Sequence, residues 1–272
     1  MIFYLSCTGN SRWAASKLAA TTREQLVFIA DYMRNGNNAK DLSKPFILKE
    51  GERLGFVFPV HGWKVPKLVR SFLEKAIIKS SSGEHPYTYA VCTAGDNIGL
   101  TMEELDKCLF ANDSLKALDI EKTDASYSLI MPESYVGLPF MDVDPKDREI
   151  RKKNESAKRL EIICEEVFDK KQDVQRLDTG NFPWINSKII GNFFEKYLIT
   201  DKRFHVESDR CVKCGICANV CPVDNIIGGK GLQPIWRHND SCLTCFACYH
   251  HCPHHAIEFG KQTQKKGQYF FK

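Results

Sequence analysis

Residues 211–222 read CVKCGICANVCP, and residues 242–253 read CLTCFACYHHCP. Both segments have the spacing C-x2-C-x2-C-x3-C-P, in which three cysteines recur at every third position and a fourth precedes a proline. Three thiolates at these intervals can wrap around one iron–sulfur cubane, whereas the fourth cysteine follows a turn and is directed toward a second cluster. The repeat therefore predicts two 4Fe–4S clusters.

Each predicted cluster takes three cysteines from one segment and its fourth from the other. The first predicted set is Cys211, Cys214, Cys217 and Cys252. The second predicted set is Cys242, Cys245, Cys248 and Cys221. Gly215 lets the backbone pass close to the inorganic core, and the proline after each fourth cysteine fixes the direction of the chain.

Zinc and disulfides are the alternative explanations of this cysteine pattern. Structural zinc is usually held by two separate C-x2-C pairs, so the third cysteine of each segment would be redundant. Disulfides are disfavoured because the sequence begins without a recognisable secretion signal, which predicts a cytoplasmic protein with reduced thiols. Of the 12 cysteines, four lie outside the repeat, and we expect Cys92, Cys108 and Cys164 among them to be small core residues.

The composition is that of a folded globular chain of about two domains. The 272 residues are 43% hydrophobic and 26% charged, which excludes a disordered or fibrous protein. No stretch approaches the ~20 apolar residues of a membrane span. The 38 Lys and Arg residues are scattered among 34 acidic ones, so a nucleic-acid partner is not expected.

The first ~145 residues alternate between strand-like and helix-like patterns. Strands are predicted over residues 2–5, 26–30, 54–60, 87–92 and 125–131, and helices over residues 12–20, 65–78 and 102–110. This alternation indicates a parallel sheet covered on both faces. A long amphipathic helix is predicted over residues 145–170. Its expected inner stripe is Ile150, Ala157, Leu160, Ile163, Cys164 and Val167.

Three regions are predicted along the chain: residues 1–175, a connector over residues 176–204, and a cluster-binding region over residues 205–272. The polar stretch 172–180 is interpreted as a boundary. Residues 182–198 are rich in aromatics and are expected to form a helix whose apolar face packs between the domains. The basic segment 261–272 is interpreted either as a docking arm or as a loosely ordered end.

The first predicted strand ends in a loop rich in hydroxyl groups, Ser6-Cys7-Thr8-Gly9-Asn10-Ser11. Its hydroxyls and backbone N–H groups can converge on one anion at the start of the following helix. The loop lacks the lysine of a nucleoside triphosphate loop, so a phosphate monoester fits better. A turn that merely caps the helix explains these residues as well. Ligands of open parallel sheets bind beyond the carboxyl ends of the strands, and this position favours the phosphate.

Two more loops follow predicted strands at the same edge of the sheet. They are Pro59-Val60-His61-Gly62-Trp63 and Thr93-Ala94-Gly95-Asp96-Asn97. Trp63 can stack on a flat ring system, although packing or a partner contact explains it equally. The second loop offers glycine and polar groups to the edge of a ring. We interpret His61 as a polar loop residue rather than a catalytic group.

These motifs resemble two known families. Residues 206–259 resemble bacterial-type dicluster ferredoxins. Residues 1–170 resemble flavodoxins, whose phosphate loop has the same hydroxyl-x-Thr-Gly-Asn-hydroxyl pattern. The whole chain resembles flavodoxin–ferredoxin fusion proteins of anaerobic bacteria and archaea. The resemblance implies an α/β fold, with a flavodoxin-like doubly wound parallel sheet of order 2-1-3-4-5 followed by a small α+β dicluster ferredoxin domain.

The resemblance also implies a cofactor and a function. FMN would be bound with its phosphate against Ser6, Thr8, Gly9, Asn10 and Ser11 and its ring at the other two loops. Electrons would pass between FMN, the two clusters and an external redox protein. Two alternatives remain open: an FMN-dependent reductase of a small organic acceptor or quinone, with His61 or Tyr135 as proton donor, and a ferredoxin with a flavin-free docking domain. The oligomeric state is left open.

Overall fold

A six-stranded parallel sheet forms the centre of the N-terminal region in the computed structural model, which describes residues 1–34 and 39–272. In spatial order its strands are β2 (Leu26–Phe28), β1 (Ile2–Tyr4), β4 (Leu54–Pro59), β6 (Thr88–Ala94), β7 (Ala125–Ile130) and β8 (Val174–Arg176). The middle strands are buried along almost their whole length, because helices cover both faces of the sheet. A mixed α/β fold with such a sheet is consistent with a flavodoxin-like fold.

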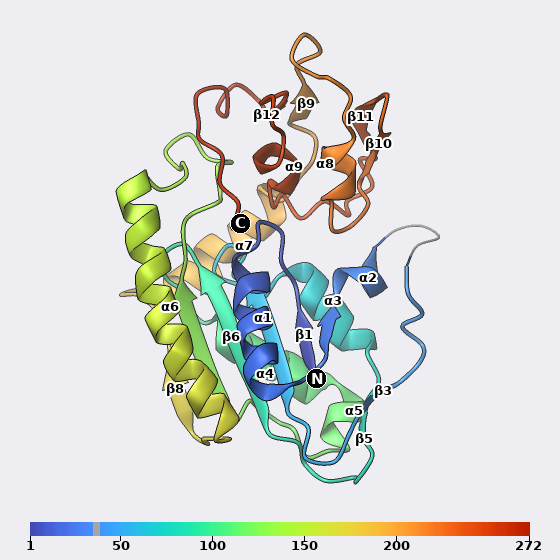
Figure 1. Ribbon diagram of the computed structural model, residues 1–272, viewed down its shortest axis with the longest axis vertical. Coiled ribbons are helices and arrows are strands. Elements are labelled where there is room, and N and C mark those ends of the chain that lie inside the picture. The colour runs from blue at the N-terminus through green and yellow to red at the C-terminus, as the bar shows by residue number, and fades with distance from the viewer. Residues whose placement is uncertain (35–38) are drawn as a thin grey trace.

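Helices lie on both faces of this sheet (Figure 1). On one face α1 (Asn10–Thr22) packs beside α6 (Lys146–Phe168), and on the other α3 (Lys67–Lys75) packs beside α4 (Thr101–Ala111). Short elements complete the region: α2 (Ala30–Met33), α5 (Asp113–Lys116) and a parallel pair formed by β3 (Phe46–Leu48) and β5 (Ile78–Ser80).

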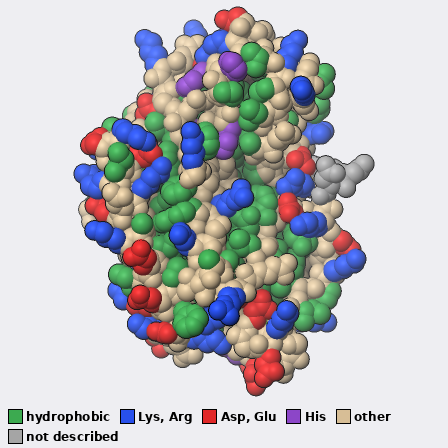
Figure 2. Space-filling view, in the orientation of Figure 1, with side chains coloured by type: hydrophobic (Ala, Val, Ile, Leu, Met, Phe, Trp, Pro, Cys, Tyr) green, Lys and Arg blue, Asp and Glu red, His purple; other side chains and the backbone are tan. Residues whose placement is uncertain are grey.

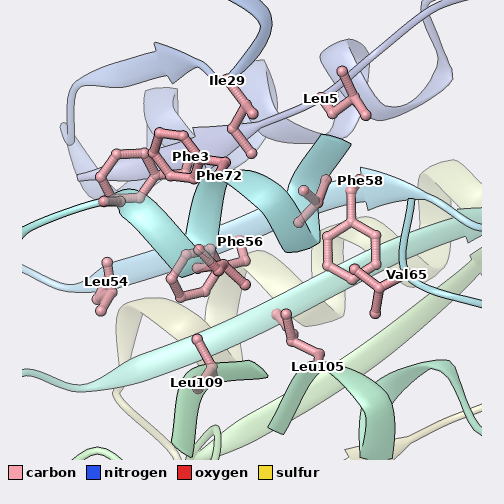
Figure 3. Close-up of a cluster of buried hydrophobic side chains, with 14 of the residues drawn as sticks. Phe3, Leu5, Ile29, Leu54, Phe56, Phe58, Val65, Phe72, Leu105 and Leu109 are labelled. Carbon is pink, nitrogen blue, oxygen red and sulfur yellow. The ribbon is translucent and has the colours of Figure 1, made fainter. Parts of the chain in front are cut away.

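Aromatic rings pack together with aliphatic side chains in the core under α3 (Figure 3). Phe3 of β1 lies 5.2 Å from Phe72 of α3 and 5.8 Å from Phe56 of β4, measured between ring centroids. Phe46 of β3 packs edge-on against Phe3 at 4.9 Å. These contacts join strands and helix into one buried cluster, which fixes the height of α3 above the sheet.

Three expectations about the N-terminal region are corrected by the structure. The stretch 172–180 is not only a boundary, because it contains β8, a sixth strand that pairs with β7 alone. An edge strand needs little apolar surface, and Arg176 is held instead by an ion pair with Glu166 at 2.7 Å. The helix expected over residues 65–78 ends at Lys75, because Ile78 starts β5. Ile150, expected in the inner stripe of α6, is 49% exposed.

The C-terminal region lies beyond the carboxyl ends of the strands (Figure 1). It contains two antiparallel pairs, β9 (Phe204–Val206) with β12 (Ile257–Phe259) and β10 (Ile226–Gly229) with β11 (Leu232–Trp236). Its helices are α8 (Ile216–Asn219) and α9 (Ala247–His250). Its core is aromatic and includes Phe204, Trp236, Phe246, Tyr249 and Phe259.

A connector helix joins the two regions and consists of the π-helical segment η1 (Ile185–Ile190) and α7 (Gly191–Tyr197). The expectation that its apolar face packs between the regions is wrong. Ser187 and Gly191 are buried, whereas most of the large apolar side chains are exposed. Phe194 is the exception, since it packs against Tyr135 with ring centroids 5.1 Å apart.

Charged side chains of both signs intermingle over the face shown in Figure 2, and histidines gather on its upper part. Within residues 1–34 and 39–272, no helix is both long enough and apolar enough to cross a membrane.

Phe72→Ala is expected to destabilise the fold by about 3–5 kcal/mol, because it leaves a cavity among buried aromatic rings. The measurement is the thermal unfolding midpoint of the anaerobically purified protein. Phe110→Ala is the matched control, since Phe110 is 52% exposed. Equal midpoints for the two variants would contradict this account of the core.

Candidate functional site

Two hollows in the C-terminal region are each lined by four cysteines. One is lined by Cys211, Cys214, Cys217 and Cys252. The other is lined by Cys221, Cys242, Cys245 and Cys248. We call them the outer and the inner hollow. The structure thus brings together the same sets of four that the sequence predicts, including the cysteine that each segment contributes to the other set.

Tight backbone turns direct the thiols into the hollows. Gly215 begins α8 with φ at +82°, and a Cβ there would lie 2.7 Å from the carbonyl carbon of Gly229, so only glycine fits. The equivalent residue before α9 is Phe246, which adopts φ +57° despite its side chain. Its ring is buried against Phe204 and Phe259. In the first segment a glycine adopts the left-handed backbone conformation without a steric penalty. In the second segment the packing of the Phe246 ring in the core holds that residue in the same conformation.

The chemistry of the eight thiols fits iron–sulfur clusters. All eight are free of disulfides. Burial raises the pKa of Cys217 to about 11, and burial together with the neighbouring cysteines raises the pKa of Cys248. Thiolates crowded in this way need a cationic core, which deprotonates its ligands outright. Among the described residues, no group of three or more His, Cys, Asp or Glu side chains is suited to one metal ion. The cysteines instead surround hollows.

Backbone N–H groups donate hydrogen bonds to three of the sulfur atoms. Asn225 N donates to Cys221 Sγ at 3.2 Å, and Ala256 N donates to Cys252 Sγ at 3.2 Å. Thr244 N donates to Cys242 Sγ at 3.3 Å. Such bonds stabilise thiolate ligands and help to set the reduction potential of a cluster.

The two hollows differ in their exposure to solvent. Cys214 of the outer hollow is exposed, and Cys211 is partly exposed. The inner hollow adjoins the core of the N-terminal region, because Val223 and Leu243 belong to the same buried cluster as the strands β1 and β4. One predicted cluster site therefore faces solvent, and the other faces the carboxyl edge of the sheet.

The loop after β1, residues 6–11, which we call the phosphate loop after the ligand predicted for it, has polar groups without hydrogen-bond partners. Among the described residues, none accepts a hydrogen bond from the backbone N–H groups of residues 6–12. Gly9 precedes α1 with φ at +97°, and no side chain caps the helix. The hydroxyl oxygen of Ser6 is buried without a hydrogen-bond partner. An orphaned hydroxyl beside an uncapped helix start is suited to a phosphate group.

The other polar side chains of this loop bond within the protein. The Thr8 hydroxyl donates to Ser134 Oγ at 3.3 Å, and Asn10 Nδ2 donates to the carbonyl of Pro132 at 3.2 Å. Ser11 shares a 2.8 Å hydrogen bond with Thr93. Sequence reasoning expected these side chains to converge on an anion. The structure uses them to attach the loop to β6 and to the segment after β7.

Residues near position 270 lie on the phosphate loop, a contact that sequence reasoning missed. The Tyr269 hydroxyl donates to Asn10 Oδ1 at 2.7 Å, and Phe271 N donates to the Thr8 carbonyl at 2.7 Å. The Phe271 ring stacks on Trp13 with centroids 5.2 Å apart. The three consecutive aromatic residues at 269–271 were the feature of the sequence that could have indicated a packed segment. The segment interpreted from the sequence as a docking arm or a loosely ordered end packs at this point on the chain's own loop.

The two loops predicted to hold a ring pack against the connector helix. A Cβ on Gly62 would lie 2.6 Å from the Phe194 ring, and Ser187 donates a 2.8 Å hydrogen bond to the Trp63 carbonyl. Asn186 Nδ2 donates to Asn97 Oδ1 at 3.2 Å. The remaining loop residues lie at or just beyond the ends of β4 and β6: Pro59, Val60, His61, Thr93, Ala94, Gly95 and Asp96.

Neither candidate proton donor is suited to that task. Burial and the positive charge of Arg70 lower the pKa of His61 to about 4, so its ring is neutral near pH 7. Burial raises the pKa of Tyr135, which makes its phenol a weaker acid. Glu133, which sequence reasoning missed, lies beside Gly95 and accepts hydrogen bonds from Ser134 N and Tyr135 N at 2.8 and 2.7 Å. Burial raises its pKa as well.

Cys7 connects the phosphate loop to the inner hollow. Its thiol lies against Cys245, and their hydrogen bond together with burial raises the pKa of the Cys245 thiol. His250 adds a second connection, because its Nε2 donates to the Ser134 carbonyl at 2.6 Å while its Nδ1 accepts from Tyr269 N at 3.2 Å. Phosphate loop, inner hollow and residue 269 therefore form one contiguous site.

Comparisons with known proteins support the iron–sulfur assignment. Residues 210–257 match the family model of the 4Fe-4S dicluster domain. No curated protein matches the chain. A crystal structure described as a "putative flavoprotein" from Bacteroides uniformis ATCC 8492 resembles 47% of this chain and 88% of its own, at 16% identity and a TM-score of 0.30.

Substituting the exchanged cysteines is expected to remove clusters across the two segments. Cys252→Ala will abolish the same electron paramagnetic resonance signal as Cys214→Ala, because both line the outer hollow. Cys221→Ala will abolish the other signal, together with Cys248→Ala. Cys108→Ala, outside both hollows, is the control and will keep both signals. If Cys252→Ala and Cys248→Ala abolished the same signal, the exchange of the fourth cysteine between the two sets would be refuted.

His61 makes stability depend on pH in a defined direction. Its pKa of about 4 in the folded state lies below the ordinary 6.5, so the unfolded chain binds this proton more tightly. The resulting stability is present above pH 6.5 and is lost as the pH falls toward 4. His61→Gln will reduce the change of the thermal unfolding midpoint between pH 7.5 and 5.5. His205→Gln, at an exposed histidine, is the control and will leave that change as it is. An unchanged slope for His61→Gln would contradict this assignment.

Proposed function

We propose that this protein transfers electrons between an FMN held at the phosphate loop, two 4Fe–4S clusters and an external redox protein. The observation that carries the proposal is the contact of Cys7, in the phosphate loop, with Cys245, in the inner set of cysteines. A flavin phosphate at residues 6–11 would then be bound beside the inner cluster. Such proximity is what transfer between the two cofactors requires.

Each cofactor would supply redox chemistry, with FMN exchanging one or two electrons and each cluster one. The residues of the chain would bind the cofactors and influence their reduction potentials. Eight thiolates would bind the clusters, and the backbone N–H groups bonded to Cys221, Cys242 and Cys252 would stabilise those thiolates. Ser6 and the free N–H groups of residues 6–12 would bind the phosphate.

The order of the sites supports a path from the sheet to solvent. The inner cysteines adjoin the core of the N-terminal region, and the field of Cys217, an outer cysteine, contributes to the raised pKa of Cys248. The outer set includes the exposed Cys214. An external partner would therefore exchange electrons at the outer cluster, while the inner cluster would serve the flavin.

An electron carrier agrees with the site better than a reductase does. A reductase needs an open flavin face and a proton donor. The loops after β4 and β6 are covered by the connector helix, and His61 is neutral near pH 7 with a pKa of about 4.

The test is the cofactor content of the protein purified without oxygen. We expect close to eight irons and one acid-released FMN per chain. Zinc in place of iron would overturn the whole proposal. Eight irons without flavin, even after incubation with FMN, would overturn the flavin part and favour a docking role for the N-terminal region.

Ser6→Ala is expected to weaken FMN binding by about tenfold to a hundredfold, because it removes a hydrogen bond to a charged phosphate. The measurement is a fluorescence titration of flavin-stripped protein that keeps its clusters. Ser81→Ala, on an exposed turn far from the loop in sequence, is the matched control. Equal affinities for the two variants would remove Ser6 from the site.

A further inference from the structure

The connector helix presents an apolar surface to solvent. Among the large side chains between residues 182 and 197, Trp184 is 59%, Ile189 55%, Phe193 56% and Tyr197 58% exposed. Other residues of the same stretch, such as Phe182 and Ile185, are exposed as well. Exposed apolar side chains scattered singly need no explanation, but a contiguous set on one helix indicates an interaction surface.

Polar contacts on the inner side hold the helix in this orientation. Ser187 donates to the Trp63 carbonyl and accepts from Leu100 N, both at 2.8 Å. Glu195 forms an ion pair with Lys64 at 3.0 Å and another with Arg70. A Cβ on Gly191 would lie 2.5 Å from the Gly62 carbonyl oxygen. The helix is therefore held through Ser187, Gly191 and Glu195, and most of its large apolar side chains remain exposed, unlike those of an ordinary surface helix.

The exposed surface is also positively charged. Lys188 and Lys196 of the same helix are exposed, and Lys196 Nζ lies 5.1 Å from the centroid of the Tyr197 ring. The acidic residue within residues 181–197 is Glu195, which is turned inward and paired. Apolar and aromatic side chains flanked by lysines, with no exposed acid among them, match the composition of helices that lie in the surface of a bilayer.

We propose that this helix docks on an anionic membrane surface, with residues 182–197 lying in the plane of the headgroups. Trp184 and Tyr197 are amphipathic rings of the kind that settle at headgroup level. Lys188 and Lys196 complement anionic lipids, each contributing about 1 kcal/mol. This docking does not depend on the proposed redox function, because none of these side chains belongs to a cofactor site.

A second copy of the chain suits this surface less well. In a symmetric dimer the same patch lies on both partners. Pairing two such helices would bring the lysines of one copy toward the lysines of the other, with no exposed acid from this stretch to neutralise them. Anionic headgroups supply the missing negative charge.

The experiment is co-sedimentation of the anaerobically purified full chain with phosphatidylglycerol vesicles and with phosphatidylcholine vesicles. We expect binding to the anionic vesicles that weakens as salt is added. The double variant Lys188→Gln/Lys196→Gln will bind about 30-fold more weakly, which corresponds to about 1 kcal/mol for each lysine. Lys49→Gln/Lys79→Gln, which removes two exposed lysines elsewhere, is the charge-matched control and will bind like the unchanged protein.

A second variant tests the apolar contribution. Ile189→Ser/Phe193→Ser will lose at least tenfold in vesicle affinity, while Phe110→Ser, at an exposed position on α4, will not. Circular dichroism and cluster absorbance will show that all variants are folded. Absence of binding to anionic vesicles, or binding that these variants leave unchanged, overturns the proposal. A dimer in light scattering that Ile189→Ser/Phe193→Ser dissociates would assign the surface to a second copy instead.

Discussion

The exchange of one cysteine between the two C-terminal segments is the constraint on which the cluster-binding region depends. Cys221 lines the inner hollow with three residues of the second segment, and Cys252 lines the outer hollow with three residues of the first. Each segment contains four cysteines, but neither hollow is lined by the cysteines of one segment alone. Both segments must therefore be in place before either set of four is complete. The aromatic core between them, with Phe246 held in a left-handed conformation, belongs to the same arrangement. The inner set is thereby placed against the edge of the sheet.

Much of this architecture could be predicted because its signals are local. The cysteine spacing predicts both sets of ligands, and short stretches rich in apolar or β-branched residues predict the buried strands β4, β6 and β7. The strand β8 could not be found in this way, since an edge strand pairs on one side only and its residues are mostly polar. The orientation of the connector helix escaped prediction because its inward partners are distant in sequence. Glu195 meets Lys64 and Arg70, which no periodicity of the helix itself reveals.

The phosphate loop shows the same limit on a smaller scale. Its composition identifies a turn rich in donors before a helix, and the sheet places that turn at the carboxyl edge. Which donors stay free depends on neighbours that the loop does not encode. Thr8 and Asn10 bond to the segment after β7, while Ser6 is left without a partner. Which donors of the loop remain free is therefore decided by the rest of the fold as much as by the loop itself.

The contact between Asn10 and Tyr269 spans 259 positions of the chain. During synthesis the loop at residues 6–11 emerges early, yet its neighbours at residues 269–271 are made last among the parts that touch it. The loop is therefore covered by Phe271 only once residues 269–271 are in place. Because the two sides of this contact belong to different regions of the fold, separating the C-terminal region from the sheet would also uncover the loop.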